Sequence, residues 1–324
     1  MAKKVESTEK FKTMIGGQAL IEGIMMLGPD KSSVVVRKKD GLRIKTEPRK
    51  VSEGFSLKKL PLIRGVFNFC ASMKMGVTSL LYSADVYAED DEEAAQEPQS
   101  RLDAWLEKHL SSEKAQSVMT TLAGVVGIAF SVALFFVLPS LIGSVINRFL
   151  TTNELVRNLL EGLVRIVIFL SYMFLVSRMK DMKRVFSYHG AEHKTIRCYE
   201  AQLPLTVENC RGMTRLHPRC GTSFLFVVVA ISILLFALVS AVFPTSNMLV
   251  RMLIRLALLP FVVSISYECN RFVGRHDNAL TRALSAPGMW FQHFTTNEPD
   301  DSMIEVGIEA LRQVLPEQEG ADRW

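Results

Sequence analysis

Cysteine is scarce in this chain, with five residues among 324 and no regular spacing. The charge pattern described below predicts that all five lie on the cytosolic side of a membrane or at its edge, where disulfides are rare. We therefore expect free thiols or metal ligands rather than a disulfide framework. The cysteines are Cys70, Cys198, Cys210, Cys220 and Cys269.

The chain also lacks a leader-like segment and an internal repeat. Its first residues, MAKKVEST, contain no apolar core of the kind found in secretory signal peptides, so we expect no cleaved leader. The net charge of +5 is only mildly basic. The excess of Lys and Arg in the cytosolic loops of membrane proteins explains that charge, and we expect no nucleic-acid partner.

Charge is missing altogether from two long segments. Residues 115–147 and 220–250 contain no Asp, Glu, Lys or Arg. Crossing the apolar core of a bilayer takes about 20 helical residues, and soluble proteins rarely hold uncharged runs as long as these. The sequence therefore predicts transmembrane helices at about 119–146 and 224–243.

Two weaker candidate spans accompany them, at 159–177 and 249–267. The first carries Glu161 and Arg165, which are four residues apart and can pair on one helix face. The second carries Arg255, which either snorkels to the interface or points into the helix bundle. We expect four spans in all.

The distribution of basic residues predicts the orientation of these spans. Residues 178–219 carry nine Lys or Arg against four acids, and the first 59 residues carry fourteen against seven. Cytoplasmic segments of membrane proteins collect Lys and Arg. We therefore expect both termini and the 178–219 loop to be cytoplasmic.

The predicted fold class is an α-helical multi-pass membrane protein of about four transmembrane helices with a small α+β cytosolic part. Residues 268–300 are expected to be irregular, and 299–315 to form an amphipathic helix capped by Asp300 or Asp301. The expected organisation is 1–60, a cytosolic unit with a β-hairpin; 61–115, an amphipathic helix, an acidic linker and a short helix; 116–178, the first two spans; 179–222, a cytosolic loop with His and Cys; 223–267, the last two spans; and 268–324, a cytosolic C-terminal segment.

Two local patterns shape the N-terminal part. VVVR and LRIK flank Asp40-Gly41, which is a strong hairpin signal. The pattern of residues 61–88 is typical of an amphipathic helix, but several polar residues interrupt its apolar face. We expect that helix to lie on the membrane surface or against the bundle rather than to span.

The segment YHGAEHKTI places His189, Glu192 and His193 in an H-x-x-E-H pattern. On a helix, two histidines four residues apart can reach one metal ion, and the glutamate between them can act as a general base on water. Gly190 inside the pattern weakens the helical interpretation. The pattern alone is weak evidence, since three fixed positions in five recur by chance.

Neighbouring residues strengthen the interpretation as a metal site. HPRC offers His217 and Cys220 at ligand-like spacing, and YECN offers Glu268 at the predicted cytosolic end of the fourth span. Imidazole, thiolate and carboxylate are ligands of zinc-type ions. We expect ligation by His189, His193 and His217 with Cys220 as the fourth, and Glu268 as a further ligand or as a carboxylate that orients an imidazole.

Other interpretations stay open from these residues. Four protein ligands would make the site structural, whereas three plus water would make it catalytic. The loop could instead face lipid headgroups or form ion pairs. Its basic residues are topology determinants or hold a phosphate group; they are Arg211, Arg215 and Arg219.

Blocks along the chain resemble the DUF1385 family of bacterial membrane proteins. The resemblance runs from about residue 15 to 315, on blocks that include GGQALIEGIMM, LPLIRGVFNF, YHGAEHKTIRCYE and LTVENCRGMTRLHPRCGTSF. It implies a multi-pass protein of the bacterial inner membrane. It also implies a metal-dependent enzyme, a description that depends on the same His and Cys residues.

Together these observations predict a membrane protein with a zinc-type site at its cytosolic face, and three functions remain in competition. The first is metal-dependent hydrolysis of a peptide or lipid-linked substrate, with Glu192 as the base. The second is a non-enzymatic scaffold or assembly factor with a structural metal. The third, an oligomeric transporter, has less support, because no acid lies at mid-membrane. Expected partners are membrane lipid and a protein partner or a second copy of the chain.

Overall fold

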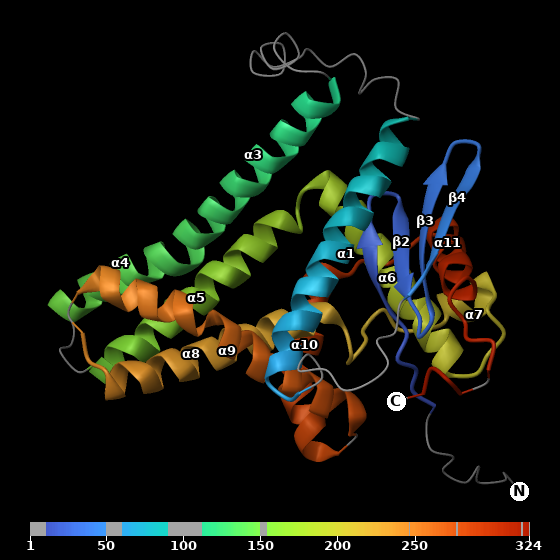
Figure 1. Cartoon of the computed structure of the whole chain (residues 1–324). Coiled ribbons are helices and arrows are strands. Elements are labelled where there is room, and N and C mark those ends of the chain that lie inside the picture. Colours follow the sequence, from blue (N-terminus) through green and yellow to red (C-terminus); the bar gives the residue numbers. More distant parts are fainter. Residues whose placement is uncertain are drawn as a thin grey trace, which may run out of the picture. The chain divides into compact units, whose positions relative to one another are not determined.

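A computed structural model of the chain describes residues 11–49, 60–89, 112–149, 154–245, 247–276, 278–318 and 320–323 (Figure 1). The chain divides into two compact units. The first, here called the sheet unit, combines 1–90, 173–228 and 263–324, and the second, here called the span unit, combines 91–172 and 229–262. The predicted acidic linker after residue 89 and the predicted short helix at 101–112 fall almost entirely outside the described residues.

The sheet unit contains a four-stranded antiparallel sheet in the order β1-β2-β3-β4. The predicted hairpin is confirmed, because β3 and β4 pair from Lys38 and Gly41 outward. The two connecting residues are Lys39 and Asp40, so Gly41, at φ 144°, opens β4 rather than sitting at the centre of the turn. The strands are β1 (Gly16–Leu20), β2 (Gly23–Leu27), β3 (Lys31–Lys38) and β4 (Gly41–Pro48).

Helices cover both faces of this sheet. Side chains alternate between the faces along a strand, so Val35 packs towards α6 (Lys180–Glu200) and α11 (Asp301–Arg312), while Val34 and Val36 pack towards α1 (Ile63–Ala88). Figure 1 shows α1 and α11 on opposite sides of the sheet. Burial on both faces explains why β2 and the middle of β3 are continuous apolar runs.

The predicted helix at 61–88 forms as α1 and lies on the sheet. Its small residues face the strands, with Gly76 against Gln18 and Ser83 fully buried. Near its start, a Cβ at Gly65 would lie 2.8 Å from the backbone of Ser264, so α1 also packs closely against the C-terminal half of α9 (Met248–Arg275). The sheet provides the apolar contact that the amphipathic pattern required.

The C-terminal part differs from expectation at one point. The predicted C-terminal helix forms as α11, with Asp300 as its N-cap accepting a hydrogen bond of 3.0 Å from the Met303 backbone N–H. The expectation of an irregular 268–300 segment is wrong, because α9 continues to Arg275 and α10 spans Ala279–Thr295. A capping box between Asn278 and Thr281 starts α10. The short helix α7 spans Val207–Arg211.

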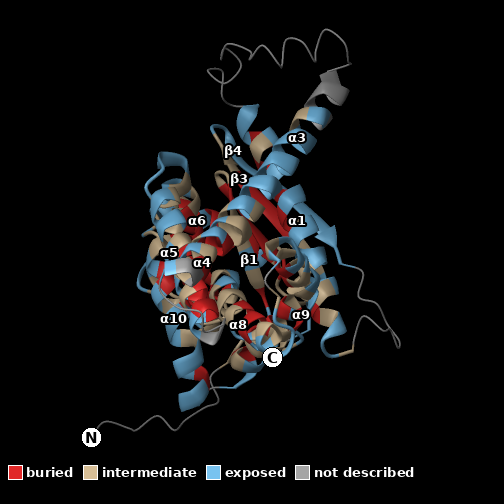
Figure 2. Cartoon of the chain, turned by 90° about the vertical axis from the view of Figure 1, so that its left-hand side faces the viewer, coloured by how far each residue is buried: buried red, intermediate tan, exposed pale blue. Residues whose placement is uncertain are grey.

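In the part of the chain that the structure describes, four helical segments are long and apolar enough to cross a membrane, as the sequence predicts. They are Val118–Ile146, Val156–Val176, Gly221–Val242 and Met248–Arg275. The first is continuous through α3 (Ser112–Val132), the π-helical turn η3 (Ala133–Val137) and α4 (Leu138–Phe149), and the others are α5 (Glu154–Val176), α8 (Gly221–Val242) and α9. Figure 2 shows α3 as largely exposed. The span from Val118 to Ile146 carries no Asp, Glu, Lys or Arg, and such a surface is suited to lipid.

Three charged residues inside the spans contact one another: Glu161, Arg165 and Arg255. Arg255 is 4% exposed and donates to both carboxylate oxygens of Glu161 and to Ser140 Oγ, so it points into the bundle rather than snorkelling. The expected pair of Glu161 and Arg165 also forms, with 3.5 Å between Oε1 and Nη2. The charged groups thus face protein rather than lipid, as intramembrane charges usually do.

Truncation of the core between α11 and the sheet tests this packing. Ile304 is fully buried there, whereas Ile44 on β4 is 42% exposed. We expect Ile304→Ala to lower the local free energy of unfolding by about 2–5 kcal/mol, and Ile44→Ala to change it by less than about 1 kcal/mol. Hydrogen–deuterium exchange of β2, β3 and α11 peptides in the detergent-solubilised chain measures both. Equal effects of the two substitutions would contradict the arrangement.

Candidate metal centre

The H-x-x-E-H pattern lies on α6, in a helix buried along nearly its whole second half. Gly190 has a clear role in that helix, because a Cβ there would overlap the carbonyl oxygen of Asn297. The backbone of Asn297 in turn donates to Phe186 O at 2.8 Å. Glycine therefore allows the 295–299 segment to cross directly over α6.

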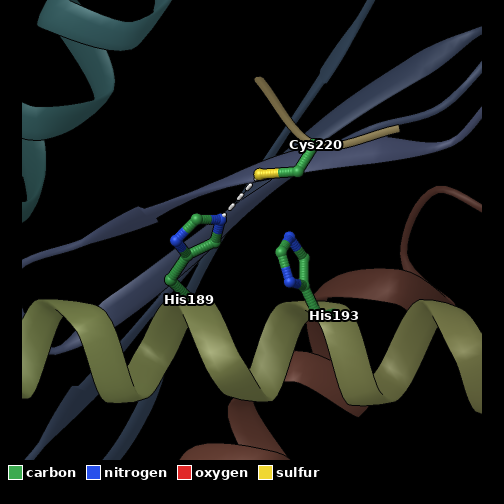
Figure 3. Close-up of side chains that lie close together, drawn as sticks. All are labelled: His189, His193 and Cys220. Atoms are coloured by element: carbon green, nitrogen blue, oxygen red, sulfur yellow. Dashed lines mark hydrogen bonds between the residues drawn. The ribbon is translucent and has the colours of Figure 1, made fainter. Parts of the chain in front are cut away.

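Three of the predicted ligands converge. One donor atom each from His189, His193 and Cys220 lie within 4.8 Å of one another, and the three residues are 8%, 1% and 6% exposed. His189 Nε2 is 3.1 Å from Cys220 Sγ, and the two imidazole centroids are 4.4 Å apart. Figure 3 shows both imidazoles rising from α6 towards the thiol. We call these residues the His-His-Cys cluster.

Backbone carbonyls orient both imidazoles. His189 Nδ1 is 2.8 Å from Thr295 O, and His193 Nδ1 is 2.5 Å from Arg215 O. A carbonyl oxygen only accepts hydrogen bonds, so each Nδ1 carries the proton and each Nε2 keeps a free lone pair. Metal-ligating histidines are usually held in this way.

One of these lone pairs has no hydrogen-bond partner. His193 Nε2 is buried and makes no hydrogen bond within the described part of the chain, although Cys220 Sγ lies close by. A buried polar atom without a partner costs about 1–3 kcal/mol, so its persistence needs an explanation. A metal ion held by two imidazoles and a thiolate would satisfy it, and the residues present fit such an ion.

The protonation states in the His-His-Cys cluster suit metal binding. Burial lowers the pKa of His193, which keeps its imidazole neutral. Burial alone would raise the pKa of Cys220, but its interaction with His193 and hydrogen bonds from Thr222 together lower the pKa of the thiol. A neutral imidazole and an easily ionised thiol are the forms that bind metals.

Glu192 lies on α6 next to the cluster but is not part of it. It is 4% exposed, and its Oε2 makes no hydrogen bond to the described residues. Its side chain packs beside Gly17 of β1, where a Cβ would lie 3.1 Å from Glu192 Cδ. Burial raises the pKa of Glu192 to about 7; the nearby His189 opposes this rise, whereas Cys220 adds to it. A carboxyl with such a pKa can both accept and release a proton near neutral pH.

The structure places His217 beside the cluster but with a different partner. Its ring centroid is 5.6 Å from that of His193, yet its Nε2 lies 3.3 Å from Glu200 Oε2. Gln292 accepts from the His217 backbone N–H at 2.8 Å and donates to the His217 carbonyl at 2.7 Å, which fixes the HPRC turn. His217 thus borders the cluster, but its ring nitrogens are not among the ligand atoms that converge there.

Glu268 is placed away from the cluster. Its carboxylate accepts from both Arg64 Nε, at 2.7 Å, and Arg64 Nη2, at 2.5 Å. The hydrogen bond from Arg64 lowers the pKa of Glu268. The structure thus joins Glu268 to Arg64, between α9 and α1, and does not bring it into the His-His-Cys cluster. The backbone oxygens of Thr295 and Arg215 orient the imidazoles instead. A sequence cannot reveal these contacts, because every residue has a backbone oxygen.

Substitution of Gly190 tests the support of the site. A methyl group in Gly190→Ala collides with Asn297 and displaces the carbonyl of Thr295 from His189. Because lost outer contacts typically weaken metal binding about 10–100-fold, we expect a drop of that size in zinc affinity, measured by competition with a fluorescent chelator. Gly212→Ala is the matched control, since its nearest neighbour would lie at 3.5 Å. Unchanged affinity in Gly190→Ala would contradict the role of the crossing segment.

Glu268→Gln separates the two carboxylate roles. The substitution weakens the pairing with Arg64 but leaves the His-His-Cys cluster intact, so we expect zinc affinity to stay within about twofold of the parent chain. The same chelator competition measures it. A loss as large as that of a ligand substitution would return Glu268 to the ligand set.

Comparison with known proteins identifies the family. Residues 60–317 match the family described as "Protein of unknown function (DUF1385)". The chain is 33% identical over 314 residues to the "Uncharacterized protein YqhQ" of Bacillus subtilis (strain 168), a match that covers 95% of this chain and 94% of that protein. No solved structure shows significant similarity. Neither description names an activity, so the implied metal-dependent enzyme gains no support from them. The chain belongs to the DUF1385 family.

Proposed function

We propose that this protein binds a zinc-type divalent ion through His189, His193 and Cys220. One observation carries the proposal: both Nδ1 atoms are occupied by backbone carbonyls, while both Nε2 atoms converge on one thiol. The ligand type also fits, because two imidazoles and a thiolate form a known set for zinc. Softer and harder ions are less well matched by this mixture.

The number of ligands favours catalysis over a purely structural role. Structural zinc sites are closed by four protein ligands, whereas catalytic sites hold three and keep one position open. When bound, the ion would supply Lewis-acid chemistry that activates water and polarises a carbonyl or phosphoryl group. Glu192 would take the proton from that water, since its buried Oε2 makes no hydrogen bond in the described chain.

The position of the site in the chain supports a membrane-associated substrate. Cys220 directly precedes α8, one of the four helices that can span a membrane. The basic residues of the 178–219 loop favour the cytoplasmic face of the bacterial inner membrane, with both termini cytoplasmic. The proposed function is hydrolysis of a peptide or lipid-linked substrate at that face.

A structural metal is the second candidate, and one contact favours it. His217 lies beside His193, and a rotation away from Glu200 would bring a fourth protein ligand towards the cluster. The ion would then fasten the HPRC turn to α6, and the protein would act as a scaffold for a partner. Transport gains no support, because Arg255 is engaged by Glu161 and Ser140.

Metal content is the first test. The detergent-purified chain should contain about one zinc per molecule by plasma mass spectrometry, and His193→Ala should lose most of it. His293→Ala is the matched control, because that histidine is exposed on α10 and bonds only to the nearby Trp290 carbonyl among the contacts described. Absence of zinc from the parent chain, after loading and washing, would refute the site.

Cobalt substitution separates the two candidates. A cobalt-loaded chain should show a thiolate charge-transfer band that disappears in Cys220→Ser. With three protein ligands, added cyanide or thiocyanate should shift the visible spectrum of the bound cobalt. A spectrum that ignores these anions in the parent chain but responds in His217→Ala would indicate a closed, structural site.

A further inference from the structure

Among the described residues of the span unit, two buried arginines share the single carboxylate of Glu161. Arg255 and Arg165 both contact Glu161, and the three residues are 4%, 6% and 1% exposed. Ser140 completes the contact with a neutral hydroxyl. One carboxylate shared by two guanidinium groups leaves an excess positive charge in this cluster. In a membrane span, such charge is expensive and usually marks a functional pathway or ligand.

Two donors in the cluster lack hydrogen-bond acceptors within the described residues. They are Arg255 Nε and Arg165 Nη2, the second of which lies 3.5 Å from Glu161 without forming a hydrogen bond. The ring of Phe236 lies 5.6 Å from the first guanidinium and 5.4 Å from the second, which offsets part of the cost by cation–π attraction. An acceptor with negative charge is what the cluster still lacks.

A hollow at the α8–α9 connection borders this cluster through the side chain of Arg255. It is lined by Arg251 and Arg255, which are one turn apart on α9, and by Ser240 near the end of α8. Its walls are apolar, with Phe236, Val239 and Leu258 among them. Basic and hydroxyl groups thus lie next to hydrocarbon in one recess.

We propose that this hollow binds the phosphoryl group of an anionic lipid. The guanidinium fork matches phosphate oxygens, and its pairing is strong where water is scarce. Basic recesses between transmembrane helices bind phosphorylated headgroups elsewhere. The apolar walls distinguish a lipid from free phosphate, because only a lipid places an acyl chain against them. In the proposed orientation, with both termini cytoplasmic, the connection between the third and fourth spans lies on the outer side, so the hollow faces the outer leaflet.

Lipid binding to the full chain tests the proposal. Native mass spectrometry of the delipidated protein with phosphatidic acid should give saturable binding, and phosphatidylcholine should bind more weakly. Arg251→Gln should weaken phosphatidic acid binding about fivefold to tenfold, as expected for one lost guanidinium contact. Arg178→Gln is the control, because that arginine is an exposed residue near the end of α5. Equal weakening in both variants would show only general electrostatic attraction and overturn the proposal.

A second variant distinguishes loss of the binding site from loss of the fold. Ser240→Leu fills the hollow without removing charge, and it should also weaken phosphatidic acid binding while zinc content and thermal unfolding stay unchanged. Competition with millimolar inorganic phosphate shows whether the ligand is a lipid or free phosphate. If phosphate does not displace phosphatidic acid, the ligand is a lipid. Full displacement by phosphate, with no loss in Ser240→Leu, would overturn the lipid and leave a phosphate site. If Arg251→Gln and Ser240→Leu both bind phosphatidic acid as strongly as the parent chain, the proposed site is wrong.

Discussion

Helix α6 places polar side chains inside the protein core, and the segments around it are arranged to give these side chains hydrogen-bond partners. Residues 188–196 are all buried, and they include His189, Glu192, His193 and Lys194. Buried polar groups are stable only when they are hydrogen-bonded. Their partners come from distant segments: Lys194 donates to Arg211 O at 2.9 Å and to Glu298, while the imidazoles donate to two further carbonyls. The segments around 211–220 and 295–299 are therefore positioned by what α6 needs.

Close backbone approach makes these bonds possible. Gly190 admits the 295–299 segment, and Gly307 on α11 fits against Thr195, where a Cβ would lie 2.7 Å from Oγ1. Gly17 plays the same part on β1, beside Glu192. Larger residues at these points would push the sheet, α11 or the crossing segment away from α6. The site is thus maintained by packing at glycines as much as by its polar side chains.

Features with a local signal were predictable from the sequence. A span depends on about 20 consecutive residues, so the sequence predicts the four candidate spans among the described residues, and the histidine pair follows from helical spacing alone. The low helix propensity of glycine argues against a helix at Gly190, but the close contact of Gly190 with Asn297 explains why glycine stands there. The partners of Glu268 and His217 are Arg64 and Glu200, and nothing in the sequence joins Arg64 to a residue 204 positions away. The orienting carbonyls could not be predicted, because every residue has one.

The two buried polar clusters differ in the kind of atom that lacks a hydrogen-bond partner. Beside the His-His-Cys cluster they are electron-pair donors, namely His193 Nε2 and Glu192 Oε2, in the part of the chain that the structure describes. Around Glu161 they are N–H groups of Arg165 and Arg255. A low-dielectric interior penalises both kinds, and only a ligand of opposite character removes the penalty. The first environment therefore favours a cation and the second an anion, so the two proposed sites have opposite charge preferences.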